Sequence, residues 1–190
     1  EVEYAYVQHS DEMYSNGIMN GISDSSLSFD NVLRLRATSH AIVKTMQRTK
    51  VDKLLRVLFD SGADKTMLKR SVLPSGVNPS LGRKRKVTGV ASTLIMDKEV
   101  ILEDLFFPEF SATKNVSGPI RAILMEHEAA PYDIIIGMDV MQKLGIDIHN
   151  STKTVVWDMH RIPFKPHDYF SNGLFAQNIQ HALDAASAAA

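Results

Sequence analysis

The sequence contains no cysteine, and this excludes several kinds of chemistry at once. Without thiols there are no disulfides, no thiolate nucleophile and no cysteine-based metal site, which fits a reducing compartment. No apolar run approaches the roughly 18 residues needed to span a bilayer, so we expect no membrane contact. The histidines show no metal-ligand spacing such as His-x-x-x-His, and we assign neither a metal nor another cofactor.

An excess of charge of either sign is also missing. The 21 Lys and Arg residues balance 22 Asp and Glu residues, for a formal net charge of -1. Nothing in that total draws the protein to nucleic acid or to a membrane surface. The 190 residues are 44% hydrophobic, which is enough for one domain with a sizeable core and flanking arms, and too little for two large lobes.

Composition divides the chain into three parts. Residues 1–38 are rich in Ser, Asn, Asp and Gly, and we interpret them as an N-terminal arm or linker with one short strand in "VEYAYV". Residues 39–164 are predicted to form the folded domain, and residues 165–190 a C-terminal extension. The start lacks an initiator methionine or a signal pattern, so we expect a segment of a longer protein; the final "AASAAA" is interpreted as a frayed tail or a cloning remnant.

Short apolar segments of strand type dominate the predicted domain. Strands are expected in "HAIVKTM", "KLLRVLFD", "KVTGV", "KEVILEDLFF", "IRAILMEHE" and "YDIIIG", with a loop in "SGVNPSLGRKRK" and a polar tip near residues 91–97. "MDVMQKLG" predicts one short helix, with Asp139 in its first turn and Gly145 ending it. "IDIHNSTKTVVWD" predicts a closing hairpin in which Trp157 packs. The predicted fold class is mainly β with one helix.

One of these strands ends in an acidic residue. "LLRVLFDSGAD" places Asp60 directly after the apolar run, where a carboxylate buried without a partner would be costly. Asp-Ser-Gly is common in turns, and alone it favours a plain strand end. A second stretch, "YDIIIGMDVMQKLG", runs from a buried strand through Gly137 into a helix. Alone it is weak as well, because strand–glycine–helix occurs in many folds.

Taken together and in this order, "LFDSGADKTML" and "DIIIGMDVMQKLGI" resemble the paired motifs of the retropepsin family, the single-lobe aspartic proteases of retroviruses and LTR retrotransposons. The second motif is most similar to the gypsy-type retrotransposon enzymes, and "KTVVWDMHRIPF" resembles the segment after the protease core in such polyproteins. The resemblance covers roughly residues 40–164. It implies a single-lobe, retropepsin-like closed β-barrel with one short helix that acts as a homodimer.

The same resemblance implies the function and the site. Asp60 is expected to be catalytic, paired with Asp60 of a second identical chain across a two-fold axis. Two carboxylates about 3 Å apart share one proton and activate a water, without a cofactor. Further residues are implied to support the catalytic loop (Ser61, Gly62, Ala63), to bind substrate (Asp64, Gly89, Val90) and to lie beneath the carboxylate pair (Ile135, Ile136, Gly137). The substrate would be an extended polypeptide, namely the element's own polyprotein, in the cytoplasm or in retroelement particles.

The flap of such an enzyme is expected in the hairpin spanning roughly residues 86–105, a lid over the substrate. The substrate site should have an apolar wall, although each candidate taken alone is more simply interpreted as a core residue. The candidates are Val90, Leu94, Ile95 and Leu124. One departure from the family pattern concerns Asp64. Compact retroviral enzymes carry an arginine after the second motif that pairs with this acid, whereas this chain has Met138. Asp64 therefore needs another partner or stays solvated.

Two other classes of function stay open on the sequence. The same motifs are compatible with a catalytically inactive retropepsin-like module for dimerisation or peptide binding. A nucleic-acid module built on "GRKRK", residues 82–86, is disfavoured by the balanced charge, and a solvated loop leading into the flap is the simpler interpretation. The arms before His40 and after Trp157 are compatible with joining a shared dimer sheet, covering the dimer, hanging free or holding an inactive precursor.

Overall fold

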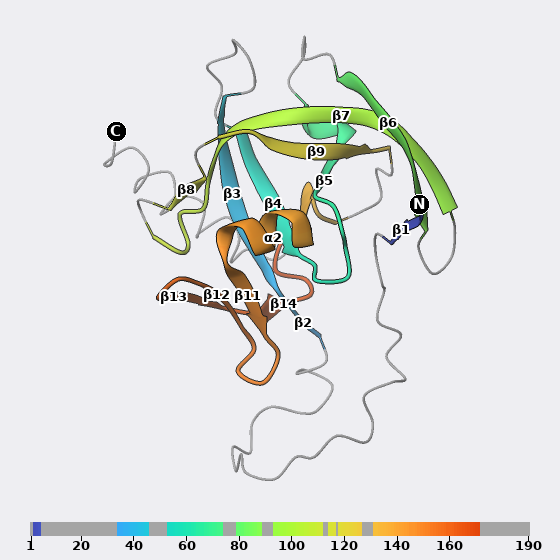
Figure 1. The fold of residues 1–190 in the computed structure, drawn as a ribbon. Coiled ribbons are helices and arrows are strands. Elements are labelled where there is room, and N and C mark those ends of the chain that lie inside the picture. The colour runs from blue at the N-terminus through green and yellow to red at the C-terminus, as the bar shows by residue number, and fades with distance from the viewer. Residues whose placement is uncertain are drawn as a thin grey trace.

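The computed structural model describes residues 2–4, 34–45, 53–73, 79–88, 93–111, 114–116, 118–126 and 131–171. Over these ranges the chain is mainly β with one α-helix, α2 (Met138–Leu144), and a short 3-10 turn, η1 (Arg70–Val72) (Figure 1). The strands are β1 (Val2–Tyr4), β2 (Leu35–Arg36), β3 (Thr38–Thr45), β4 (Lys53–Phe59), β5 (Met67–Lys69), β6 (Ser80–Thr88), β7 (Thr93–Phe106), β8 (Asn115–Val116), β9 (Ile120–Met125), β10 (Ile134–Ile136), β11 (Ile146–His149), β12 (Thr154–Trp157), β13 (His160–Pro163) and β14 (Lys165–Pro166).

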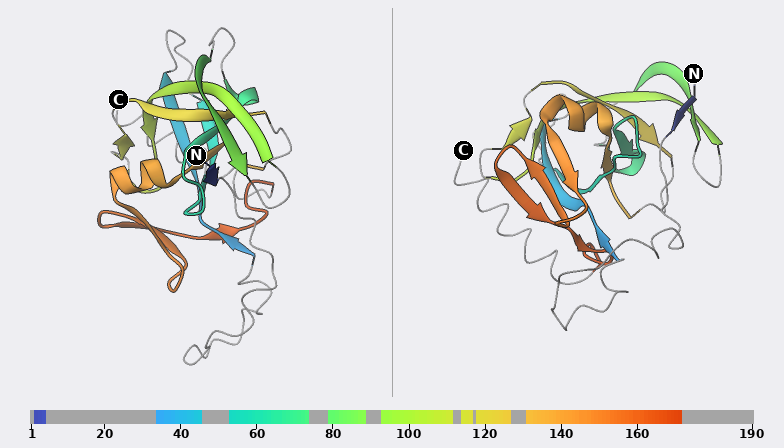
Figure 2. Two further views of the ribbon diagram at one scale, coloured as in Figure 1. Left: turned by 45° about the vertical axis from the view of Figure 1, so that its right-hand side comes forward. Right: turned by 60° about the horizontal axis from the view of Figure 1, so that its bottom comes forward.

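Most of the described strands belong to one nine-stranded sheet. Its order is β1-β6-β7-β3-β4-β10-β5-β9, with β8 beside β7, and β9 also pairs with β7. A separate three-stranded sheet, β11-β12-β13, and the pair β14-β2 complete the topology. The β11–β13 sheet and the long β6–β7 hairpin lie at opposite ends of the molecule, as all three views show (Figures 1 and 2).

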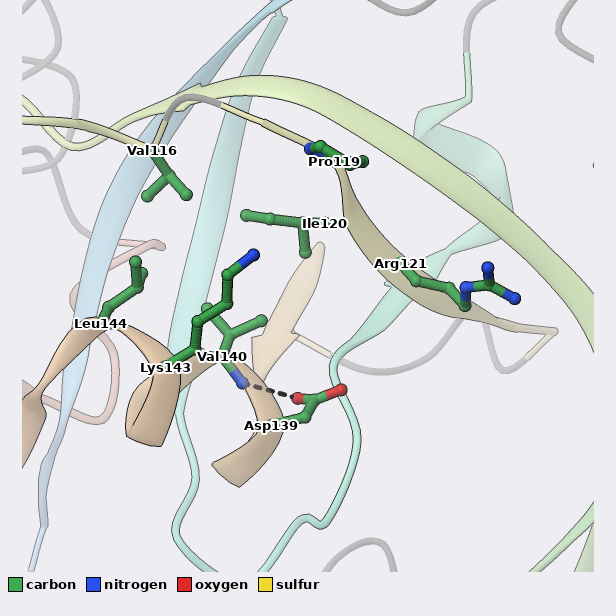
Figure 3. A pocket seen from close by; sticks show the side chains of 8 residues that line it. All are labelled: Val116, Pro119, Ile120, Arg121, Asp139, Val140, Lys143 and Leu144. Carbon is green, nitrogen blue, oxygen red and sulfur yellow. Dashed lines mark hydrogen bonds between the residues drawn. The ribbon is translucent and has the colours of Figure 1, made fainter.

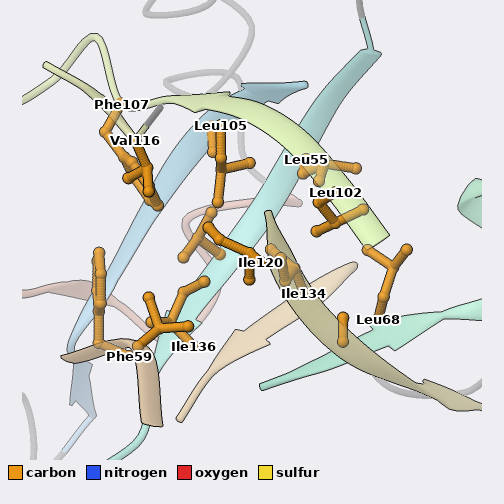
Figure 4. Packing of buried hydrophobic residues seen from close by; sticks show 14 of the residues in the cluster. Leu55, Phe59, Leu68, Leu102, Leu105, Phe107, Val116, Ile120, Ile134 and Ile136 are labelled. Carbon is orange, nitrogen blue, oxygen red and sulfur yellow. The ribbon is translucent and has the colours of Figure 1, made fainter. Parts of the chain in front are cut away.

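Strand alternation explains the main core. Leu55, Val57 and Phe59 of β4 point to one face of the sheet and pack in the largest hydrophobic cluster, together with Ile134 and Ile136 of β10 (Figure 4). The Phe59 ring packs at a tilt against Phe107, with centroids 5.9 Å apart, and edge-on to Phe110, with centroids 6.0 Å apart. Fully burying such a side chain stabilises the fold by roughly 1.5–3 kcal/mol.

The opposite face of the same strands carries a smaller cluster. Leu58 and Ile135, which alternate with the main-core residues, face this side. Half-buried Met96 and Phe170 pack against it. We call this set the second cluster: Leu58, Ala63, Met67, Val87, Ile123, Met125, Tyr132 and Ile135.

Several predicted elements are confirmed. β3 and β4 pair antiparallel, as the apolar patterns indicated. The predicted helix is α2, with Asp139 in its first turn, and it ends at Gly145, whose left-handed φ of 67° favours glycine. The closing hairpin is β11–β12, and Trp157 is buried there, edge-on to Phe107 and Phe110. The predicted closed barrel stays a prediction.

The loop predicted for "SLGRKRK" is wrong, because residues 80–86 are part of β6. Pairing with β7 decides this conformation, since β7 runs antiparallel to β6 along most of its length. A bulge lies between Leu81 and Arg85. The polar tip is also narrower than predicted, because β7 begins at Thr93.

A buried carboxylate fixes the base of the β6–β7 hairpin. Glu99 on β7 accepts hydrogen bonds from Arg85 on β6, at 3.2 Å, and from Arg121 on β9, at 2.9 Å. Its side chain is 5% exposed, so these two cations supply the partners that a buried charge requires. A Cβ at Gly82 would lie 2.5 Å from the Glu99 side chain, which explains the glycine. Arg85 of the basic run is thus bound within the fold.

We predict that Trp157→Ala lowers the free energy of unfolding by about 3–5 kcal/mol, because it empties a buried aromatic site between two phenylalanines. Urea denaturation measures the loss. The matched control is Met159→Ala in the next turn, an 88% exposed side chain whose loss should change stability by less than about 0.5 kcal/mol. A Trp157 variant as stable as the control would show that the hairpin is only an appendage.

Candidate active site

Asp60 directly follows β4, and β10 fixes its main chain. The two strands are parallel, with Ile136 opposite Phe59, and the Asp60 amide donates to the Ile136 carbonyl at 3.0 Å. The half-buried carboxylate accepts the Gly62 amide at 2.9 Å. Strand pairing therefore delivers this acid to a defined place, with one oxygen already bound by the adjoining loop.

The loop of residues 60–66 crosses the end of β10, and we call it the catalytic loop after the role predicted for Asp60. β10 lies between β4 and β5, which are the strands that enter and leave this loop. At the crossing, a Cβ on Gly137 would lie 2.5 Å from the Lys65 carbonyl carbon and 2.8 Å from the Ala63 oxygen. Contacts this short with backbone are not tolerated, so only glycine allows the catalytic loop to rest here.

The backbone amides of the first residues of α2 donate hydrogen bonds to the catalytic loop. The Met138 amide donates to the Ala63 carbonyl at 2.8 Å, and the Asp139 amide donates to the Asp64 carbonyl at 3.3 Å. These amides have no partner within the helix, because the first turn of any helix leaves its N–H groups free. The catalytic loop supplies the acceptors.

Thr66 completes this attachment. Its amide and its hydroxyl both donate to Oδ1 of Asp139, each at 2.9 Å, and its hydroxyl accepts the Gly137 amide at 3.1 Å. The same carboxylate oxygen accepts the Val140 amide at 2.9 Å, as Figure 3 shows. Asp139 is thus a helix-terminus residue, as predicted, and it also holds the catalytic loop. Thr66 was not among the residues predicted from the sequence; a threonine directly after "DSGADK" was the available signal.

The structure brings most of the predicted site residues together. Asp60, Ser61, Gly62, Ala63 and Asp64 share the catalytic loop, in which Ser61 and Asp64 are exposed and Ala63 is fully buried. Ile135, Ile136 and Gly137 run beneath that loop, in register with the end of β4. Their roles stay predictions. Gly89 and Val90 lie outside the described residues.

The hairpin predicted as a flap reaches the catalytic loop through its apolar face. Val87 of β6 packs in the second cluster, which also contains Ala63 of the catalytic loop. β1 pairs with the outer edge of β6 and places Glu3 opposite Val87. Among the wall candidates, Leu124 is buried in the main core, whereas Ile95 is 74% exposed and its role in the wall stays a prediction.

A partly buried ion pair anchors the far end of β10. Arg56 donates to Asp133 through its side chain at 2.8 and 2.9 Å and through its amide at 2.9 Å. Burial alone would raise the pKa of Asp133, but the hydrogen bonds from Arg56 outweigh it, and the net effect lowers the pKa of this carboxyl below its usual value. The pair fixes the register that places Gly137 under the catalytic loop.

A pocket of about 180 Å³ lies between α2 and β9 and is not part of the candidate site (Figure 3). Asp139 and Lys143 of α2 line it from one side and Ile120 and Arg121 of β9 from the other, with the Lys143 side chain pointing toward Ile120. None of its lining residues comes from the catalytic loop. Its one link to the site is Asp139, which holds Thr66.

In the part of the chain that the structure describes, no group of three or more His, Asp or Glu side chains is arranged to hold a metal ion. Nor does any described helix have the length and apolar character needed to cross a bilayer.

A single-lobe β domain with an Asp-Ser-Gly loop resting on a strand–glycine–helix element is the arrangement expected of an aspartic protease domain. Residues 36–149 match the family described as retroviral aspartyl protease. The match covers more than half of the chain, and the chain belongs to this family.

The solved structures to which the chain is similar include the following three. The retroviral protease-like domain of Ddi1 from Leishmania major is 14% identical, with a TM-score of 0.43, over 70% of this chain and 94% of that one. EIAV protease complexed with the inhibitor HBY-793 is 23% identical, with a TM-score of 0.37, over 58% of this chain and 88% of that one. A retropepsin-like aspartic protease from Rickettsia conorii is 11% identical, with a TM-score of 0.37, over 59% of this chain and 75% of that one. No curated protein sequence matches the chain.

We predict that Thr66→Val lowers the free energy of unfolding by about 1–3 kcal/mol, because it leaves the buried Gly137 amide without its acceptor and takes one donor from Asp139. Valine has the shape of threonine, so packing is preserved. Thr66→Ser keeps the hydroxyl and should retain most of the stability. Chemical denaturation measures both variants, and equal stability of the two would contradict the role given to the hydroxyl.

We predict that Asp133→Asn costs about 1.5–3 kcal/mol of stability at neutral pH, and that this loss shrinks in acid. The pKa of Asp133 is lower in the folded chain than in the unfolded one. At a pH between these two pKa values, the unfolded chain therefore binds more protons than the folded chain. The stabilisation is complete above the unfolded pKa of about 3.8 and disappears as the pH falls through the folded pKa. Unfolding curves from pH 7 to pH 2 test this; a loss independent of pH would contradict it.

Proposed function

We propose that this protein is an aspartic endopeptidase that works as a homodimer, with Asp60 of each chain forming the catalytic pair. The observation that carries the proposal is the catalytic loop itself: an acid at the end of a buried strand, held from below by Gly137, Thr66 and Asp139. Membership of the retroviral aspartyl protease family supports the same class of reaction.

The second carboxylate comes from a second chain in this proposal. The other acid bound to the catalytic loop, Asp139, already accepts three hydrogen bonds at one oxygen and serves the fold. Asp60 is only half-buried, and Ser61 beside it is exposed, so both face a side where a partner can approach. A two-fold axis beside Asp60 would place two identical carboxylates together and let Ser61 donate across the interface.

The proposed reaction needs only that pair and a water molecule. Two carboxylates this close cannot both ionise, and a shared proton between them is the established behaviour of aspartic proteases. One carboxylate takes a proton from the water as the water attacks the peptide carbonyl, while the other protonates the carbonyl oxygen. The tetrahedral diol then collapses, and proton return expels the amine. Apparent pKa values would belong to the pair rather than to either chain's Asp60.

An extended polypeptide is the substrate we propose. It would lie between the catalytic loop and the β6–β7 hairpin, in contact with Asp64, Gly89 and Val90 through main-chain hydrogen bonds. The second cluster offers the apolar surface for its side chains, since it combines Ala63 of the catalytic loop with Val87 of the hairpin. The return of β9 to β7 supports a sheet that closes into the barrel of this class.

The biological setting is also a proposal. The motif "IIIGMDVMQKLGI" supports an origin in a gypsy-type LTR retrotransposon, where such an enzyme would process its own polyprotein in the cytoplasm or in retroelement particles.

We predict that Asp60→Asn reduces peptide cleavage at least about a hundredfold, because asparagine can neither take nor return the proton. Cleavage of a library of unstructured peptides by the purified chain measures the activity, and sedimentation measures the dimer. The variant should keep the thermal midpoint and the dimer of the parent protein.

Asp147→Asn is the matched control, since this exposed carboxylate lies on β11, outside the loop that carries Asp60, and should leave turnover unchanged. Unchanged cleavage by Asp60→Asn would refute the proposed mechanism. A dimer that binds peptides and never cuts them would favour the catalytically inactive peptide-binding module instead.

A further inference from the structure

The chain beyond the family match folds back onto the protease domain. The match ends at residue 149, whereas described structure continues to residue 171. β13 extends the hairpin sheet, and β14 pairs with β2, which places Lys165 opposite Arg36 and Pro166 opposite Leu35. We call residues 164–171 the C-terminal strap. The strap thus crosses from the closing hairpin to the first strand of the domain.

Several contacts anchor the C-terminal strap. The Phe164 amide donates to the Lys153 carbonyl at 2.7 Å. The Lys165 ammonium donates to Glu109, which also accepts the Ser39 hydroxyl at 2.6 Å, and it lies 5.5 Å from the centre of the Tyr169 ring. Tyr169 is itself buried. These contacts fix the path of the strap from Phe164 to Tyr169, the residue before Phe170.

That residue, Phe170, packs against the second cluster. Its ring lies edge-on to Tyr132, with centroids 5.9 Å apart, and edge-on to Tyr169 at 5.2 Å. Phe170 stays half-exposed, in contrast to the buried ring of Tyr169. An aromatic ring held on an apolar surface, with one side open to water, is placed as a ligand side chain would be.

The second cluster is a buried apolar cluster that adjoins the loop of Asp60. Leu58 precedes the catalytic acid by two residues, Ala63 belongs to the catalytic loop, and Ile135 lies opposite Leu58 on β10. Val87 adds the hairpin that would cover a substrate. A peptide lying across Asp60 would therefore bring its side chains onto the surface that Phe170 contacts.

We propose that the C-terminal strap is an internal competitor of the substrate, and that Phe170 occupies the place of an apolar, preferably aromatic, substrate side chain. This inference rests on the proposed protease function and deepens it. Binding of a peptide then requires Phe170 to leave the second cluster. Only molecules in which the strap has left can bind, so the apparent affinity for the peptide falls in proportion to their fraction. Removing the ring should remove that reduction.

The test measures binding of pepstatin, an apolar peptide inhibitor of aspartic proteases, to the full chain by calorimetry. Phe170→Ala should bind it roughly fivefold or more tightly than the parent protein, because the occupied fraction no longer competes. Phe170→Leu keeps an apolar side chain and should stay within about twofold of the parent. Met159→Ala, which removes an exposed apolar side chain in the turn between β12 and β13, is the matched control and should not change the affinity.

Hydrogen exchange gives a second readout that needs no variant. The Ser171 amide donates to the Asp168 carbonyl at 2.9 Å within the strap, and pepstatin should speed exchange at this amide in the parent protein. Unchanged exchange, or binding that is unaltered or weaker in Phe170→Ala, would overturn the proposal and make Phe170 a wall of the site.

Cleavage assays separate this inference from the proposed function. Turnover by the parent protein with no gain in kcat/KM for Phe170→Ala means that the strap proposal fails and the protease stands. If Phe170→Ala binds pepstatin more tightly and neither protein cleaves peptides, the strap proposal is supported and the proposed protease function is refuted.

Discussion

The contact between the catalytic loop and the backbone at Gly137 is the constraint on which the rest of the site depends. The loop lies so close that a single Cβ at this position would collide with the Lys65 and Ala63 backbone. That closeness lets the first amides of α2 reach the loop carbonyls and brings Thr66 to Asp139. Parallel pairing of β10 with β4 sets the position of the glycine, and the Asp60 main chain is held by the same pairing through the Ile136 carbonyl.

Local patterns in the sequence were sufficient for the elements that carry the site. The apolar runs around residues 54–59 and 134–136, the helix with its terminal glycine and the closing hairpin all follow from spacing and turn chemistry. The end of β6 follows from the strand pattern of "KVTGV", but its beginning does not, because a run of Lys and Arg resembles a solvated loop and only pairing with β7 makes it a strand. Thr66–Asp139 and Arg56–Asp133 join residues 73 and 77 positions apart, and such partners leave no local signal.

The family match and the folding unit do not end at the same place. Val155, Trp157 and Ile162 lie beyond residue 149, yet they are buried in the main core with Phe59 and Ile136. Shared strands explain this, because β12 pairs with β11 inside the matched region and β13 pairs with β12 outside it. The core that supports Asp60 therefore includes the hairpin just past the matched region, and stability and site geometry are coupled through the same aromatic contacts.

Glu99 also has a mechanical consequence. Its carboxylate joins β6 and β9 through two arginines at the point where the β6–β7 hairpin leaves the body of the sheet. Glu99 is 5% exposed and is also the last residue of β7 that pairs with β9. Beyond it, toward the tip, β7 continues in its pairing with β6. We therefore expect any bending of the hairpin to begin beyond Glu99, where the support from β9 ends.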